Sequence, residues 1–272
     1  MQFDEIGYWS EIKHTIIKRY AAEYCRILRN DNRFKISYID AFSGAGIHFS
    51  KESETLVPGS PLNALSINPP FHEFHFIDLN SEKLDFLRAQ IPERSDVKLY
   101  NGDANEVLAS QVLPQIKWNQ YQRALCVLDP YGLQLDWRII EMAGKSRSVE
   151  IFLNFPTMDM NRNALWNDPS KVPDHYKERM TRYWGDETWR KAAYTTQGNL
   201  FGYEEKAGNA EVAEAFRQRL KSIADFKYVP SPLPLRNSSG AIVYYLFFAS
   251  QNDTGRKIVE HIFGMFRERG RN

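Results

Sequence analysis

The stretch Asp40-Ala41-Phe42-Ser43-Gly44-Ala45-Gly46 comes directly after an apolar run, Ile36-Ser37-Tyr38-Ile39. A second apolar run, Phe74-His75-Phe76-Ile77, ends at Asp78. Glycines at the end of a first parallel strand let the backbone approach a ligand closely, and a carboxylate at the end of the second can accept both hydroxyls of a ribose. Together the two strand ends indicate an α/β protein that binds a nucleoside at the carboxyl edge of its sheet.

Five apolar runs alternate with stretches of helical spacing along the first half of the chain. This alternation predicts an α/β fold in which a mostly parallel sheet carries helices on both faces. Ser10 is expected to cap the first helix, and further helices are expected to begin at roughly Ser60, with Pro61 in its first turn, and at Asn80 or Ser81. The expected strands are 36–39, 74–77, 97–100, 124–128 and 149–153.

The segment 47–59 lies between the glycines and the helix that starts at Ser60. It is polar, and it places Asp78 much further from the glycines than the roughly 20 residues of a compact dinucleotide-binding fold. We expect a loop here, and its position beside the predicted ligand favours a lid.

The pattern changes after residue 225. Residues 228–235 contain three prolines, which cannot donate to a neighbouring strand, so this strand is expected at an edge of the sheet. Residues 241–249 are apolar on both faces and are expected inside the sheet, with a hairpin turn at 237–240 and a final helix over 254–269. Five alternating strands followed by a hairpin whose last strand inserts inward resemble the Rossmann-like sheet of class I methyltransferases.

Three parts are expected along the chain. Residues 1–156 hold an N-terminal helix and the cofactor-binding half of the sheet, 157–225 form a helical, aromatic-rich insertion or cap, and 226–272 complete the sheet. The insertion mixes basic with aromatic residues, as single-stranded nucleic-acid binders do, although its charges nearly balance. Nucleic-acid binding, a protein interface and a cap over the active site stay open for it. Its aromatic residues include Trp166, Tyr176, Tyr183, Trp184, Trp189 and Tyr194.

The composition indicates an ordinary globular protein, with 272 residues of which 43% are hydrophobic and 25% charged. A net charge of +1 gives no overall basic field, so a nucleic acid would have to bind a local patch. Cys25 and Cys126 stand far apart and the first residues do not resemble a signal peptide, which indicates the reducing cytosol. The longest apolar run, 241–249, is too short to cross a membrane.

The glycine turn lacks both the third glycine of GxGxxG and the GK[ST] of a P-loop. S-adenosylmethionine has no phosphates, so these absences disfavour NAD and ATP and leave S-adenosylmethionine as the predicted cofactor. Asp78 is expected to hold its ribose, although an aspartate there can also cap the next helix; Asp103 can accept from the adenine amino group or only stabilise a turn. The expected cofactor-binding residues are Asp40, Phe42, Gly44, Gly46, Asp78, Leu79, Asp103, Ala104 and Asp129.

Asp129-Pro130-Tyr131 ends the fourth strand and is similar to the Asp-Pro-Pro-Tyr motif of enzymes that methylate exocyclic amino nitrogens. There a carboxylate accepts hydrogen bonds from the amine while the aromatic ring stacks on its plane. This chain has one proline instead of two, so specificity for an amino nitrogen stays open, as does a plain structural turn. Asp129 and Tyr131 are the expected catalytic residues. The expected substrate-binding residues are Pro130, Asn154, Pro156, Asp159 and Arg162.

Several of these motifs together resemble the three-Cys-motif partner family (TcmP), whose members are similar to class I methyltransferases. The resemblance covers most of the first 160 residues. It implies S-adenosylmethionine as cofactor and a protein partner that carries a three-cysteine motif and is encoded nearby, but it implies no substrate. The matching segments are Trp9-Ser10-Glu11-Ile12-Lys13, Tyr38 to Gly46, Pro58-Gly59-Ser60-Pro61-Leu62, Phe76-Ile77-Asp78, Leu128-Asp129-Pro130-Tyr131-Gly132 and Phe152-Leu153-Asn154-Phe155-Pro156.

We therefore expect a cytosolic methyltransferase that acts on a nucleobase, a nucleic acid or a molecule delivered by its partner. Two alternatives stay open. One is a methyltransferase-fold protein that binds its partner without catalysis, and the other is a nicotinamide oxidoreductase, which would share the ribose carboxylate. A metal site at His72 and His75 is not expected, because strand side chains three residues apart point to opposite faces.

Overall fold

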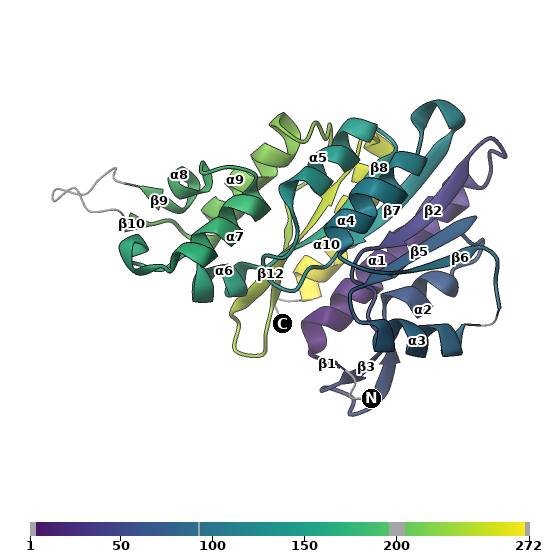
Figure 1. The fold of residues 1–272 in the computed structure, drawn as a ribbon, viewed down its shortest axis with the longest axis horizontal. Helices are drawn as coiled ribbons and strands as arrows, with labels where there is room; N and C mark the ends of the chain where they lie inside the picture. Colours follow the sequence, from purple (N-terminus) through teal and green to yellow (C-terminus); the bar gives the residue numbers. More distant parts are fainter. Residues whose placement is uncertain (1–3, 92, 196–204, 270–272) are drawn as a thin grey trace.

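A computed structural model describes residues 4–91, 93–195 and 205–269 of the chain (Figure 1). Its centre is a seven-stranded sheet in which the strand order is β11-β12-β8-β7-β2-β5-β6. The strands are β2 (Lys35–Asp40), β5 (Glu73–Asp78), β6 (Val97–Asn101), β7 (Gln122–Leu128), β8 (Val149–Phe155), β11 (Leu233–Arg236) and β12 (Ile242–Ala249).

Within this sheet the five strands β2, β5, β6, β7 and β8 are mutually parallel. Strand β12 runs antiparallel to both of its neighbours, β8 and β11. The proline-containing strand β11 lies at the edge, as its missing donors require. The inserted strand β12 is buried along most of its length. The predicted class I methyltransferase sheet, with its inward-turned last strand, is thereby confirmed.

Helices cover both faces of the sheet, and the buried apolar residues form one cluster on each face. One cluster joins the sheet to α1 (Tyr8–Leu28), α2 (Ser60–Leu65), α3 (Ser81–Gln90) and α10 (Asp253–Arg269). The other joins it to α4 (Ala104–Val107), a π-helical turn (Leu108–Val112), α5 (Trp137–Ser146) and the helices that follow β8. In the described part of the chain, no helix combines the length and apolar character that crossing a membrane needs.

The N-terminal helix begins earlier than its sequence suggests. Its N-cap is Gly7, and Ser10 lies inside the first turn without capping it. Its buried stripe is also rotated: Ile27 is exposed, whereas Lys13 is buried one turn before Ile17. Apolar spacing alone did not separate this lysine from the solvated lysines and arginines of the same helix.

The segment 47–59 was expected to be a loop, and this prediction is wrong. It forms a β-hairpin of β3 (Ile47–Ser50) and β4 (Leu56–Pro58), and β1 (Glu5–Ile6) adds to it as a third strand. The three strands lie beside the N-terminal end of α1 (Figure 1). Glu11 of α1 accepts a hydrogen bond from the Ser50 hydroxyl, which fastens the hairpin to the helix.

The region after β8 is helical, with α6 (Thr157–Asn163), α7 (Asp174–Trp184), α8 (Trp189–Ala193) and α9 (Asn209–Ser222) gathered at one end of the molecule (Figure 1). A two-stranded pair, β9 (Tyr194–Thr195) and β10 (Glu205–Lys206), adjoins them. Five aromatic residues of this helical region belong to the core cluster that also contains α5: Tyr183, Trp184, Trp189, Tyr194 and Phe216. Because these rings are buried, they cannot stack on the bases of a nucleic acid.

Candidate functional site

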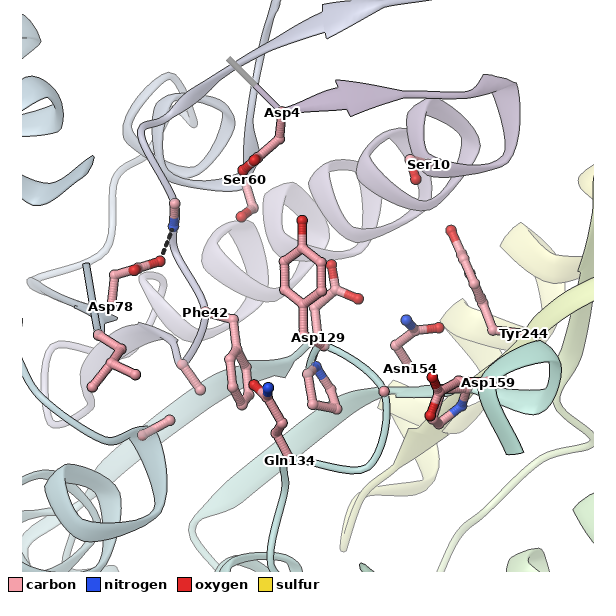
Figure 2. A pocket seen from close by; sticks show the side chains of 18 of the residues that line it. Asp4, Ser10, Phe42, Ser60, Asp78, Asp129, Gln134, Asn154, Asp159 and Tyr244 are labelled. Carbon is pink, nitrogen blue, oxygen red and sulfur yellow. Dashed lines mark hydrogen bonds between the residues drawn. The ribbon is translucent and has the colours of Figure 1, made fainter. Parts of the chain in front are cut away.

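A cavity of about 850 Å³ opens at the carboxyl edge of the sheet, where the strand ends of β2, β5, β6, β7 and β8 meet (Figure 2). The topology brings these ends to one rim because parallel strands all point their carboxyl ends the same way. Thirteen of the fifteen predicted site residues line it: Phe42, Gly44, Asp78, Leu79, Asp103, Ala104, Asp129, Pro130, Tyr131, Asn154, Pro156, Asp159 and Arg162.

The carboxylate of Asp78 is held at the rim by backbone donors. Its Oδ2 accepts from the Gly44 amide at 2.8 Å (Figure 2). Its Oδ1 accepts from the Asn80 amide at 2.8 Å. The N-cap of α3 is Asn80, whose side-chain oxygen accepts a hydrogen bond from the backbone amide of Lys83, so Asp78 does not cap this helix. Each oxygen of Asp78 retains lone pairs for a further donor, as a ribose-binding carboxylate needs.

Gly44 provides open backbone beside this carboxylate. Its φ is +63°, a conformation that favours glycine, and a Cβ atom there would contact only the edge of the His48 ring at 4.0 Å. A residue with a side chain would therefore project into the cavity space next to Asp78. The turn thus leaves room for a ligand to approach the main chain.

Asp103 lies at the end of β6 and caps α4. Its Oδ1 accepts from the amides of Asn105 and Glu106 at 2.9 and 3.2 Å. Asp103 therefore stabilises the turn before α4, and its side chain also lines the cavity. Asn105 connects this end to the loop after β7, because its amide group bonds the backbone of Gln134 and Asp136 at 2.9 and 2.8 Å.

Asp40 and Gly46 do not line the cavity, although both were expected to bind the cofactor. Asp40 is completely buried and accepts from the Phe42 amide at 3.3 Å and from the Ser60 hydroxyl. Burial raises its pKa to about 7, against the opposing effect of these two hydrogen bonds. Gly46 packs on α3, where a Cβ would lie 2.6 Å from Leu87. Both residues therefore support the glycine turn from the side that faces away from the cavity.

Asp129 is paired with a residue that the sequence did not single out. The ammonium group of Lys13, from α1, donates to Asp129 Oδ2 inside the cavity wall. Lys13 is almost completely buried, whereas Asp129 remains about 29% exposed. Burial opposes the charged form of Lys13, but Asp129 and, less strongly, Tyr244 outweigh it and raise its pKa above the ordinary value. Lys13 is therefore an ammonium ion at neutral pH.

The far side of the cavity contains the predicted acceptor residues. Figure 2 shows Asn154 and Asp159 on the opposite side of Asp129 from Asp78. Asp159 accepts from the Asn163 amide group at 2.9 Å, and its carboxylate contacts Gly132, where a Cβ would lie 2.6 Å from Oδ2. Tyr131 is 69% exposed, so its ring is free to contact a bound molecule.

Two histidines line the cavity next to the N-terminal hairpin. His14 of α1 and His48 of β3 stack with their ring centroids 5.5 Å apart. Burial and the nearby Lys13 lower the pKa of both rings, so both are neutral at physiological pH. Across 4–91, 93–195 and 205–269, no cluster of three or more histidine, cysteine or carboxylate side chains suits a metal ion.

The cavity is rich in carboxylates. Eight acidic side chains line it against four cationic ones. Three of the cations are already paired, Lys13 with Asp129, Lys83 with Asp4 and Arg182 with Asp136. The electrostatic character of the site therefore suits a ligand with positive charge.

A scan against known protein families and a search of curated proteins gave no match. Among solved structures, the chain is similar to LPL1258 from Legionella pneumophila, with 12% identity, coverage of 90% of this chain and 89% of that one, and a TM-score of 0.52. This likeness shows a shared fold.

Two further similar structures have lower TM-scores. The methyltransferase domain of bacterial CtHen1 has 12% identity, coverage of 86% and 99%, and a TM-score of 0.42. A SAM-dependent methyltransferase from Leishmania major has 6% identity, coverage of 87% and 72%, and a TM-score of 0.40.

Proposed function

We propose that the protein is an S-adenosylmethionine-dependent methyltransferase. The observation that carries the proposal is the fixed carboxylate of Asp78, which the open backbone of Gly44 holds at the rim of a carboxylate-rich cavity. Asp103, Asp78, Gly44 and Asp129 stand at the ends of β6, β5, β2 and β7, which are consecutive in the sheet. Strands lie about 4.8 Å apart, so these four ends span roughly 14 Å.

The cavity residues suit the chemical groups of this cofactor. Asp78 offers carboxylate oxygens to two ribose hydroxyls, and Asp103 retains acceptor capacity for an amino group. The surplus of carboxylates suits a cation, and the cofactor is a sulfonium. When bound, this cofactor supplies an activated methyl group with a good leaving group.

The protein's own residues then have to orient the acceptor and exclude water. Lys13 donates a hydrogen bond to one carboxylate oxygen of Asp129. The other oxygen is available to accept a hydrogen bond from the molecule that receives the methyl group. Tyr131 supplies an exposed ring beside it, and Pro130, Asn154, Pro156, Asp159 and Arg162 form the surrounding wall. The proposed acceptors are a nucleobase, a nucleic acid or a molecule delivered by a partner, in a cytosolic setting.

The proposal is tested by calorimetric titration with S-adenosylhomocysteine. The wild type is expected to bind, and Asp78→Asn to bind roughly tenfold or more weakly, because a charge-assisted hydrogen bond contributes about 1.5–3 kcal/mol. The matched control is Asp85→Asn, a carboxylate on the exposed side of α3 that pairs with Arg88. Equal loss in both variants, or no binding by a folded wild type, would refute the proposal.

A second candidate function is a methyltransferase-fold protein that works by binding a three-cysteine-motif partner. Leu79 and Tyr131 at the cavity mouth favour it, since both are large hydrophobic residues that are mostly exposed. This hypothesis predicts that Asp129→Ala leaves partner assembly and cellular activity unchanged. Loss of activity with intact assembly would reject it, and competition between NAD and S-adenosylhomocysteine tests the nicotinamide alternative.

A further inference from the structure

The ion pair between Lys13 and Asp129 lies in the wall of the proposed methyl-transfer site, so a role for it in ligand binding rests on the proposed function. Lys13 comes from α1, near the N-terminal end of the chain, whereas Asp129 comes from the end of β7. The lysine ammonium also lies 5.3 Å from the centroid of the Tyr244 ring, on β12. The pair thus joins three elements at the rim.

Stability alone does not account for this pair. Burying Lys13 and most of Asp129 costs a desolvation free energy that their attraction only roughly repays, so an apolar pair of similar volume is often as stable. Lys13 nevertheless occupies a position on the buried stripe of α1 that Ile16 and Ile17 continue. The consequence of the lysine is electrostatic: it cancels the charge of the Asp129 carboxylate in the cavity wall.

Cancelling this charge affects the binding affinity of the cofactor more than that of its product. S-adenosylmethionine carries a positive sulfonium, whereas S-adenosylhomocysteine has a neutral thioether in the same place and is otherwise the same ligand. If the nucleoside binds at Asp78 and Asp103, at the ends of β5 and β6, the sulfur-bearing part of either ligand would extend along the rim toward β2 and β7, where Asp129 lies. An unpaired carboxylate there would attract the sulfonium selectively and leave the thioether almost unaffected.

We propose that Lys13 sets the ratio of affinities for S-adenosylmethionine and S-adenosylhomocysteine by neutralising Asp129. Removing either member of the pair leaves one unbalanced charge, and the two removals have opposite signs. A unit charge about 8 Å away at an effective dielectric constant of roughly 40 changes an equilibrium about fivefold. The affinity ratio is therefore expected to rise about fivefold in Lys13→Met and to fall by a similar factor in Asp129→Asn.

The test is calorimetric titration of both ligands, at one pH and low salt, into the wild type, the two single variants and the double variant Lys13→Met/Asp129→Asn. The double variant has no charge at either position, so its ratio should return to near the wild-type value. Using the ratio cancels any general weakening of the pocket, because both ligands share the nucleoside and amino acid parts. Should Asp129→Asn fail to fold with an unpaired buried lysine, Lys13→Met and the double variant still provide the comparison.

The outcomes separate the two levels of the proposal. Opposite shifts in the single variants, with restoration in the double variant, support the role of Lys13. A ratio that stays within about twofold in all folded variants, or that moves in the same direction in both single variants, overturns it while leaving cofactor binding intact. Absence of binding of either ligand to the wild type overturns the proposed function and this inference with it.

Discussion

The buried carboxyl group of Asp40 should make the stability of the protein depend on pH. Its pKa is about 7 in the folded protein and 3.8 in the unfolded reference. The folded-state pKa is raised, so the folded protein retains a proton between about pH 4 and 7 that the unfolded chain has lost. The stability contributed by protonated Asp40 is therefore complete below pH 4 and is lost as the pH rises through 7.

The size of this effect depends on the separation of the two pKa values. A difference of about 3 units at about 1.4 kcal/mol per unit lowers the free energy of unfolding by roughly 4 kcal/mol across the whole range. About 2 kcal/mol of this loss falls between pH 5 and pH 7. Asp40→Asn removes the titrating group, and its amide can still accept from the Phe42 amide and donate to the Ser60 hydroxyl.

Urea unfolding of the wild type and Asp40→Asn at pH 5, 6, 7 and 8 measures the prediction. The wild type should lose about 2 kcal/mol relative to the variant between pH 5 and 7. Ser60→Ala is a second variant: the Ser60 hydroxyl lowers the Asp40 pKa, so the pH window of the loss should move upward without it. Parallel stability curves for the wild type and Asp40→Asn, or a wild type that gains relative stability with pH, would refute the reasoning.

Three further predictions concern packing and are all measured by urea unfolding. Gly144→Ala should lower the free energy of unfolding by more than about 3 kcal/mol, because the added Cβ would lie 1.8 Å from the Ala224 carbonyl oxygen. Gly264→Ala, which adds a Cβ in open space, should be neutral or stabilising by up to about 1 kcal/mol. Equal effects of the two substitutions would contradict this prediction. Phe216→Ala should cost about 3–5 kcal/mol, because the ring is fully buried among other aromatic rings; a cost below 1 kcal/mol would contradict it. Tyr131→Ala should change stability by less than about 0.5 kcal/mol, since the side chain is mostly exposed, and a larger loss would show a structural role.

The strand ends were predictable from the sequence because each combines a short apolar run with a polar residue at its end. Asp78, Asp103 and Asp129 follow such runs, and parallel pairing brings all three to one rim. The position of β12 inside the sheet was equally predictable, because its residues are apolar on both faces whereas β11 contains proline. Local pattern was sufficient wherever a residue's own element fixes its position.

Contacts between distant segments were not predictable in the same way. Lys13 contacts Asp129 across 116 residues, and nothing near either residue specifies the other. The hairpin of β3 and β4 likewise acquires its third strand from Glu5–Ile6, far back in the chain. The sequence offers a partial signal for Lys13 alone, because it lies on the same helical face as Ile17, Tyr20 and Tyr24.

The position of β12 constrains how the molecule can be assembled during synthesis. Strand β8 is buried along its whole length, and one of its edges pairs with β12, which is made about 90 residues later. Until then a growing chain exposes an apolar strand with unpaired backbone groups, a surface on which other nascent chains can add. We therefore expect truncation before Ile242 to produce aggregation instead of a smaller folded protein, and general chaperones to be needed most at this stage of translation.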